Sequence, residues 1–186
     1  SEVEKLKEDL KRALDEHRKR LEELKKELED VLRRHEEKVR RLKEKLKRIL
    51  DEIRRLSRIR DEEALRKIVE DARRLLEEIE RRMRESHKEV ERLLKRVEDD
   101  IERSTRELRK LLEEIRDRLD KLRKDLDERL LEDLDRALDE VRKEVEKLNR
   151  DAKRTLDKVR EDVKRLDDDL RRTLKRVKEE IDKLTK

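Results

Sequence analysis

The apolar residues of this chain recur with an 18-residue period, and this period constrains the fold more than any other feature. Such a period corresponds to five turns of an α-helix at about 3.6 residues per turn, so the apolar stripe runs straight along the helix. A heptad repeat would instead impose a left-handed supercoil. The period therefore predicts long, nearly straight α-helices. In the first third of the chain the repeated sets are Val3, Leu6, Leu10 and Leu14, then Leu21, Leu24, Leu28 and Leu32, then Val39, Leu42, Leu46 and Leu50.

The composition also favours helices throughout the chain. The 186 residues include no Gly, Pro, Cys, Phe, Trp or Tyr, and 63% are charged while 31% are apolar. At ordinary usage of about 7% Gly and about 5% Pro, a chain of this length would lack both with a chance on the order of 10⁻¹⁰. Such high charge is typical of disordered chains, but the periodic Leu, Ile and Val residues give every helical turn an apolar face to bury. We therefore expect a folded helical chain with a thin core.

The apolar stripe changes phase at two places, and we expect the turns between helices there. The first lies at residues 57–61, where Asp61 suits the N-cap of the next helix and the two glutamates after it favour the positive end of the helix dipole. The second lies near residues 125–131. The predicted helices span about 2–58, 62–126 and 131–185, in one elongated bundle over residues 1–186. Because short connections make successive helices antiparallel neighbours, the predicted fold class is all-α, a single-chain, up-down-up three-helix bundle.

Polar residues of rare types interrupt the apolar stripe without leaving its phase, and within each helix they follow the same period as the apolar residues. In an antiparallel pair of helices, facing positions share a midpoint that lies in the turn. The midpoints fall near residue 61 for the first and second helices and near residue 130 for the second and third, where the stripe changes phase. The sequence therefore predicts two polar layers. One contains His17, Ser104, Thr105 and Thr155, and the other contains His35, Ser86, His87 and Thr173.

We interpret these layers as hydrogen-bond networks that specify the register of the helices. Leucine layers that repeat with a fixed period can slip by one repeat at little cost. A slipped His or Ser loses its partner and leaves a buried polar group, which costs about 1–3 kcal/mol. A neutral imidazole has one donor and one acceptor, and a hydroxyl serves as both, so His, Ser and Thr can close a small network. The residues do not determine which hydroxyl pairs with which ring nitrogen.

Two other interpretations of the histidines remain open. They could lie at the surface or boundary of the bundle, or they could bind a metal or a porphyrin. Only His35 and His87 could share a metal ion, and zinc would need further ligands. The segment from His35 to Val39 begins like the HExxH zinc motif, but Val39 stands where that motif has its second histidine. We therefore expect no metal and no cofactor.

Serine and histidine occur together in both layers, which raises the question of nucleophilic catalysis. We identify no carboxylate in phase with the layers that would orient an imidazole. The chain offers no glycine-rich loop for an oxyanion hole, and the stripe implies no pocket. The sequence therefore predicts no catalytic residues and no enzyme.

The charge pattern and the hydropathy argue against several partners. The net charge of +5 and the pI near 9.3 come from interleaved acidic and basic residues, with no aromatic residue on which bases could stack, so we expect no nucleic-acid binding. No apolar segment approaches the roughly 18 residues of a membrane span, and residues 1–10 lack the features of a signal peptide. We expect a soluble protein, cytoplasmic on recombinant expression, with no targeting signal and no required partner.

The whole chain resembles de novo designed parametric helical bundles with buried hydrogen-bond networks. The resemblance depends on the 18-residue stripe, the absence of Gly, Pro and aromatic residues, and the in-phase His, Ser and Thr layers. It implies a thermostable structural scaffold without an evolved ligand. One departure is that such designs often use Gly or Pro in their loops, and this chain has neither.

A second interpretation is an interaction module that accepts a further helix or a second copy of the chain. Paired leucines widen the apolar face of the second predicted helix at 75–76, 93–94 and 111–112. The predicted register also brings Lys186 only to about residue 74, which would leave the hairpin near residue 61 uncovered, and an uncovered apolar end favours a partner. A third interpretation, a lipid-surface protein, is disfavoured because interfacial Trp and Phe are absent and in-phase polar residues have no use against lipid.

Overall fold

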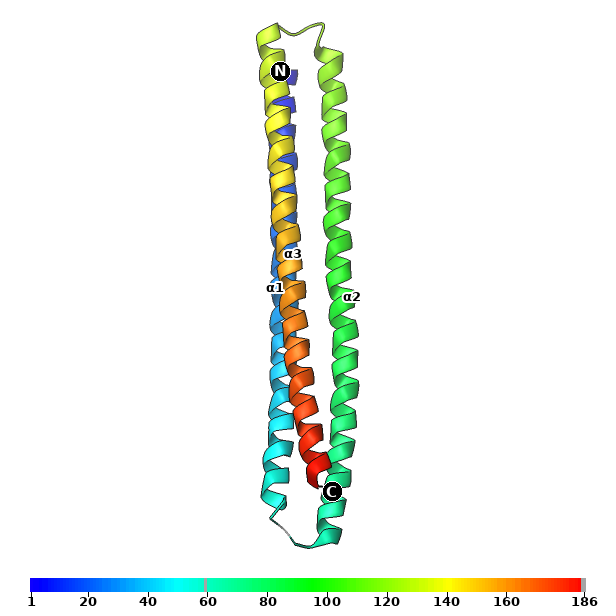
Figure 1. The fold of residues 1–186 in the computed structure, drawn as a ribbon. Helices are drawn as coiled ribbons and strands as arrows, with labels where there is room; N and C mark the ends of the chain where they lie inside the picture. Colours follow the sequence, from blue (N-terminus) through cyan, green and yellow to red (C-terminus); the bar gives the residue numbers. More distant parts are fainter. Residues whose placement is uncertain (59, 185–186) are drawn as a thin grey trace. The chain divides into compact units, whose positions relative to one another are not determined.

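The computed structural model describes residues 1–58 and 60–184, which form three α-helices joined by two short connections (Figure 1). α1 spans Glu2–Leu56, α2 spans Glu62–Leu122 and α3 spans Glu128–Leu184. α2 runs antiparallel to α1 and α3 (Figure 1), and the described residues include no strand. The predicted fold class, an all-α three-helix bundle in up-down-up order, is confirmed.

The first connection is close to its predicted place. The Asp61 carboxylate caps α2, because its Oδ1 accepts hydrogen bonds from the backbone N–H groups of Glu63 at 3.1 Å and Ala64 at 3.5 Å. The predicted N-cap is therefore confirmed. α1 ends at Leu56, two residues earlier than predicted. Residues 59 and 185, the predicted turn isoleucine and the predicted end of the third helix, lie outside the described residues.

The second connection lies earlier than predicted. α2 ends at Leu122 instead of about residue 126, and α3 begins at Glu128 instead of residue 131. The Asp125 N–H bonds to the Leu122 carbonyl at 3.0 Å, a three-residue bond that closes the turn. The apolar stripe misplaced this turn because Leu126, which lies in the connection, packs against the core as a helical residue would.

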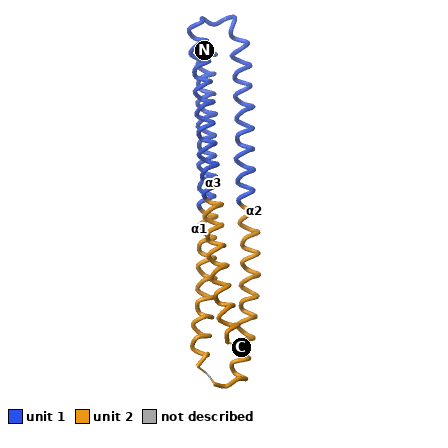
Figure 2. Tube along the Cα trace, in the orientation of Figure 1, with its two compact units in different colours: residues 1–29, 94–158 blue, residues 30–93, 159–186 orange. Residues whose placement is uncertain are grey.

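The three helices contribute to two compact units, which Figure 2 distinguishes by colour. Unit 1 comprises residues 1–29 and 94–158, and unit 2 comprises residues 30–93 and 159–186. Each unit therefore contains a segment of every helix and has a buried apolar cluster of its own. The cluster of unit 1 contains Leu6, Leu10, Ala13, Leu108, Leu112, Ile115, Leu119, Leu134, Leu138 and Val145. The cluster of unit 2 contains Val39, Leu42, Leu46, Ile49, Ile53, Val69, Ala72, Leu76, Ile79, Leu170, Leu174, Val177 and Ile181.

In unit 2, α3 extends further along α2 than predicted. Ile181 is 1% exposed and belongs to the same buried cluster as Ile53 and Val69, which flank the first connection. Asp182 lies beside Arg73 of α2, with an oxygen–nitrogen distance of 3.3 Å. α3 nevertheless ends short of the first connection (Figure 1), so the part of the hairpin near residue 61 that has no third helix beside it is shorter than predicted but still present.

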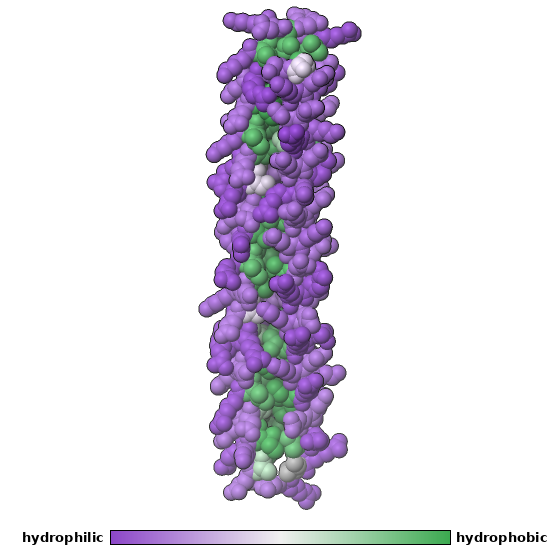
Figure 3. Space-filling model, turned by 180° about the vertical axis from the view of Figure 1, so that it is seen from behind, coloured by the Kyte–Doolittle hydropathy of each residue, from purple (hydrophilic) through white to green (hydrophobic). Residues whose placement is uncertain are grey.

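A few leucines remain at the surface. Leu75 and Leu111 of α2 are 48% and 43% exposed, and Leu130 near the start of α3 is 38% exposed. Figure 3, which views the molecule from the side opposite to Figure 1, shows apolar side chains between the charged ones in each unit. None of the described helices contains a stretch long and apolar enough to cross a membrane.

Candidate functional site

Unit 1 contains a polar layer centred on His17 of α1, whose side chain is buried. Its Nδ1 lies 3.0 Å from the Oγ of Ser104 on α2, and its Nε2 lies 2.9 Å from the Oδ1 of Asn149 on α3. A carbonyl oxygen only accepts, so this arrangement assigns the ring proton to Nε2 and leaves Nδ1 to accept the Ser104 hydroxyl proton. One neutral imidazole therefore links all three helices.

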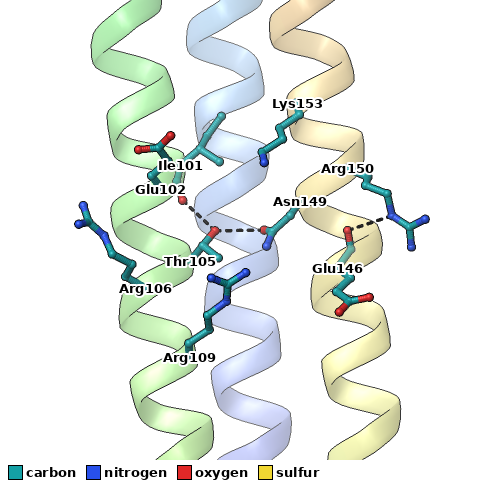
Figure 4. A pocket seen from close by; sticks show the side chains of 9 residues that line it. All are labelled: Ile101, Glu102, Thr105, Arg106, Arg109, Glu146, Asn149, Arg150 and Lys153. Carbon is teal, nitrogen blue, oxygen red and sulfur yellow. Dashed lines mark hydrogen bonds between the residues drawn. The ribbon is translucent and has the colours of Figure 1, made fainter.

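Thr105 joins the same layer from α2. Its hydroxyl lies 2.9 Å from the Ile101 carbonyl oxygen and 3.3 Å from Asn149 Oδ1, so its single proton is shared between these acceptors. Figure 4 shows Thr105 and Asn149 directed toward each other from α2 and α3, at a pocket of about 550 Å³. Charged side chains such as Arg109 and Lys153 surround this pocket (Figure 4). The Asn149 oxygen therefore accepts hydrogen bonds from two helices.

Unit 2 contains the corresponding layer, centred on His35, whose side chain is 1% exposed. Its Nε2 lies 2.8 Å from Asp167 Oδ1, and its Nδ1 lies 3.3 Å from Ser86 Oγ. The second carboxylate oxygen, Oδ2, lies 2.9 Å from His87 Nδ1. A carboxylate only accepts, so both imidazoles donate an N–H to Asp167, and His35 Nδ1 accepts the Ser86 hydroxyl proton. His87 is partly exposed, and its Nε2 lies 3.5 Å from Glu91.

The two layers are repeats that differ in charge. Asn149 and Asp167 occupy equivalent positions in successive repeats of α3, and each accepts an N–H from the buried histidine of its own unit. Unit 1 therefore uses a neutral amide where unit 2 uses a carboxylate. The second donor also differs, because Thr105 supplies a hydroxyl in unit 1 and His87 supplies an imidazole in unit 2.

The surroundings shift the pKa values of two of these groups. Burial lowers the pKa of His17 below its ordinary value, although the hydrogen bond to Asn149 acts in the opposite direction. Burial by itself would raise the pKa of Asp167, but the hydrogen bonds from His35 and His87 outweigh it, so the pKa of this carboxyl is lowered. At neutral pH His17 is therefore uncharged and Asp167 is ionised.

Most of the predicted layer residues come together, but two do not join the hydrogen-bonded groups. His17, Ser104 and Thr105 meet in unit 1, and His35, Ser86 and His87 meet in unit 2. The hydroxyls of Thr155 and Thr173 instead donate to the carbonyls of Asp151 and Asp169, four residues earlier in the same helix, at 3.1 and 3.0 Å. Each threonine thus satisfies its hydroxyl locally.

The register predicted from the two threonines has to be corrected. The observed pairs between α2 and α3, Thr105 with Asn149 and His87 with Asp167, share a midpoint at residue 127 instead of 130. The partners on α3 therefore lie six residues before the predicted threonines, which is about 9 Å along the helix. This shift also explains why the second connection begins earlier than predicted.

Sequence reasoning missed Asp167 because it searched the stripe only for rare polar residue types. It missed Asn149, the only asparagine of the chain, because it assigned the α3 positions of both layers to Thr155 and Thr173. The statement that no carboxylate is in phase with the layers is wrong, since Asp167 occupies a core-facing position of α3. Both residues could have been found from the helical spacing, because they fall in the series of core positions that are three and four residues apart. In α3 these positions are Val145, Asn149, Ala152, Leu156, Val159, Val163, Asp167, Leu170 and Leu174.

Every buried side-chain nitrogen or oxygen in the described part of the chain has a hydrogen-bond partner. Within residues 1–58 and 60–184, no group of three or more His, Asp or Glu side chains is arranged to hold a metal ion. The layers are therefore closed by their own hydrogen bonds, and the chemistry they display is that of donors and acceptors matched across three helices.

Comparison with known proteins finds similarity at the level of the fold. No protein-family model and no curated protein sequence matches the chain. A solved structure described as a computationally designed three helix bundle superposes with a TM-score of 0.60 over 98% of this chain and 84% of that chain, at 23% sequence identity. This chain has the fold of a designed three-helix bundle. At this identity the likeness concerns the fold alone.

Proposed function

We propose that this chain is a designed structural scaffold, without an evolved activity, whose helix register is specified by the two polar layers. The observation that carries the proposal is that each buried histidine makes hydrogen bonds through both of its ring nitrogens. One ring nitrogen pairs with a serine of α2 and the other pairs with an amide or carboxylate oxygen of α3. The strict 18-residue repeat and the designed neighbour of the same fold support a designed origin.

The two layers oppose slippage because a shift by one repeat leaves one of them without its histidine. If α1 moved by one repeat relative to the other helices, His17 would meet the partners of His35, and Asn149 and Ser104 would lose their imidazole. Each buried polar group left without a partner costs about 1–3 kcal/mol. An all-leucine stripe would lose far less in the same movement, because each leucine would meet another apolar residue.

The register proposal can be tested with two spin labels in unit 1. Glu8 and Glu140 are exposed on α1 and α3, and the chain has no native cysteine, so Glu8→Cys and Glu140→Cys accept labels selectively. We expect a single distance in the parent chain. A second variant has every polar residue of the two layers replaced by Leu, Ala or Val of similar size. This variant should show a second population, in which one label is displaced by about 27 Å along the helix axis relative to the other. The replaced residues are His17, His35, Ser86, His87, Ser104, Thr105, Asn149 and Asp167.

A variant that keeps one sharp distance after the apolar replacement would show that the register is set elsewhere. The control is the same labelled pair with Thr155→Val and Thr173→Val, whose hydroxyls bond only within α3 in the structure. That control should keep the single distance of the parent.

A second candidate function is self-association through α2. It is favoured by the exposed Leu75 and Leu111, which lie on the helix that carries the widened apolar face. Light scattering coupled to size exclusion, with refractive-index detection because Trp and Tyr are absent, distinguishes the two candidates. A mass near 23 kDa at all loadings supports the self-contained scaffold. A stable dimer that Leu75→Glu and Leu111→Glu dissociate supports the second.

A further inference from the structure

Three side chains of unit 2 form a chain of hydrogen bonds in the order hydroxyl, imidazole and carboxylate. Ser86 Oγ lies 3.3 Å from His35 Nδ1, and His35 Nε2 lies 2.8 Å from Asp167 Oδ1. In this chain Asp167 accepts the Nε2–H, so the lone pair of Nδ1 is directed at the serine hydroxyl. A nucleophile, a general base and a group that orients the base are the parts that acyl transfer to serine requires.

Ser86, at one end of this series of hydrogen bonds, is accessible from solvent. Ser86 is partly buried and lines a groove of about 440 Å³ between α1 and α2, whereas His35 is enclosed behind it. The groove also includes Leu42 and more cationic than anionic side chains, five against three. A small reactant in the groove can therefore reach the serine oxygen while the base and the carboxylate stay shielded from water.

We propose that Ser86 is a reactive serine that accepts an acyl group from activated esters, with His35 as general base and Asp167 as the residue that positions it. This activity goes beyond the scaffold function. The preferred acyl group carries a free carboxylate, because the groove presents an excess of cationic side chains. Aryl monoesters of short dicarboxylic acids have this chemistry.

The proposed reaction has two balanced steps. Ser86 Oγ attacks the ester carbonyl carbon and its proton moves to His35 Nδ1, while Nε2–H remains hydrogen-bonded to Asp167. The bond between the carbonyl carbon and the aryl oxygen then breaks, and the proton on Nδ1 passes to the departing aryloxide or to solvent water, which leaves His35 neutral again. In the second step, water attacks the carbonyl carbon of the acyl-serine and gives a proton to His35 Nδ1. The bond between that carbon and Ser86 Oγ then breaks, His35 Nδ1 passes the proton to Oγ, and the dicarboxylic acid departs.

The position of Ser86 limits the rate of this reaction. Ser86 lies in the middle of α2, so its backbone N–H belongs to the helix and no backbone donors surround the attacked carbonyl. Side chains such as Lys45 and Arg48, which line the groove, are the cations available to the developing oxyanion. Both steps are slowed by this lack of donors, but an aryloxide is a much better leaving group than the serine alkoxide. We therefore expect acylation to be faster than hydrolysis of the acyl-serine, so that the acylated chain accumulates.

Unit 1 provides a matched internal control. Ser104 Oγ lies 3.0 Å from His17 Nδ1, and His17 Nε2 bonds to Asn149, so the arrangement is the same except that an amide replaces the carboxylate. Ser104 also lines a groove, of about 350 Å³, with three anionic and two cationic side chains. Because the charges of the two grooves differ, the effect of a carboxylate in unit 1 is measured by comparing Asn149→Asp with the parent chain at Ser104 itself.

The experiment uses the full chain with 4-nitrophenyl hydrogen glutarate. Nitrophenolate release is followed at pH 7.5, the reaction is quenched in acid, and mass spectrometry locates the glutaryl group. We expect a burst of one nitrophenolate per chain and a glutaryl ester on Ser86. The Asp167→Asn variant should acylate Ser86 about a hundredfold more slowly, and Asn149→Asp should accelerate acylation of Ser104 by a similar factor relative to the parent chain.

A further variant and the site of acylation exclude other nucleophiles. Ser86→Ala should abolish the burst, and mass spectrometry of the parent chain should find the glutaryl group on Ser86 and not on His87. Circular dichroism and urea midpoints verify that each variant is folded. The proposal is overturned if no acyl-serine forms, if only lysine or His87 is acylated, or if Ser86 reacts at the same rate with Asp167→Asn.

Discussion

His35 Nε2 donates a hydrogen bond to Asp167 Oδ1 over 2.8 Å, and this bond joins α1 to α3 inside unit 2. The same carboxylate accepts an N–H from His87 of α2, so Asp167 is the group on which all three helices converge. In unit 1 the same position is held by Asn149. A carboxylate and an amide at equivalent positions should therefore contribute differently to stability and to histidine ionisation.

Loss of the carboxylate in unit 2 should destabilise the fold. Asp167→Ala leaves the buried Nε2–H of His35 without its acceptor, and we expect the free energy of unfolding to fall by about 1–3 kcal/mol. Urea titration at pH 7.5, followed by circular dichroism, measures this change. The control is Asp157→Ala, an exposed position of the same helix, for which we expect a change within about 0.5 kcal/mol. Equal effects of the two variants would contradict this view of Asp167.

Acid should weaken unit 1 through His17. Burial lowers the pKa of this imidazole in the folded chain below the unfolded value of about 6.5. The unfolded state therefore binds the proton first, so the contribution of His17 to stability is complete above about pH 6.5 and declines as the pH falls below it. The slope for one histidine cannot exceed about 1.4 kcal/mol per pH unit.

Urea midpoints at pH 7.5 and pH 5 test this dependence. His17→Gln retains a donor and an acceptor but does not titrate, so the difference between the two midpoints should be smaller than in the parent chain. Carboxylates elsewhere contribute equally to both proteins and cancel in the comparison. An unchanged difference in His17→Gln would mean that His17 does not cause the decline.

A single substitution should give unit 1 the electrostatics of unit 2. In Asn149→Asp, a carboxylate replaces the amide that accepts the His17 Nε2–H, and an adjacent negative charge favours the protonated imidazole. We expect the pKa of His17 to rise relative to the parent chain, as followed by the NMR shift of its Cε1 proton. The resonance of His35 in unit 2 serves as the internal reference. A pKa of His17 that stays the same or falls would contradict the proposed contact.

The cap of α2 should contribute independently of the layers. Asp61→Ala removes the oxygen that accepts from Glu63 and Ala64, and we expect a loss of about 1 kcal/mol in the free energy of unfolding. Asp61→Asn should restore most of that stability, because asparagine is an equally good N-cap residue. If both variants lost the same stability, charge at the helix dipole would be the dominant effect instead of the hydrogen bonds.

Much of the fold was predictable because the information is local and repeated. The 18-residue stripe predicted three helices, and Asp61 with the two glutamates after it predicted where α2 begins. The histidine and serine pairs gave the register of α1 against α2 correctly, since Ser104 and Ser86 do face His17 and His35. These predictions succeeded because each depends on residues of types that are rare in this chain and placed in phase.

The errors have a common origin in α3. Thr155 and Thr173 were predicted to join the polar layers because threonine is uncommon in this chain. Their hydroxyls instead form hydrogen bonds within their own helix. Asp167 is one of 56 acidic residues, and only its core-facing spacing distinguishes it from those at the surface. The register of α3 was therefore misjudged by six residues, and with it the second connection and the length of the first hairpin that α3 covers.

The sequence by itself determined the number of helices, their direction, the capping of α2 and the rows of side chains that face inward, because backbone hydrogen bonding and apolar periodicity act within one helix. Only the tertiary structure decided which acceptor meets each histidine. Several polar side chains of α3 lie near the inward face, and the choice among them depends on a displacement along the helix axis. Packing of the three helices sets that displacement, and it places Asn149 and Asp167, not the threonines, against the imidazoles.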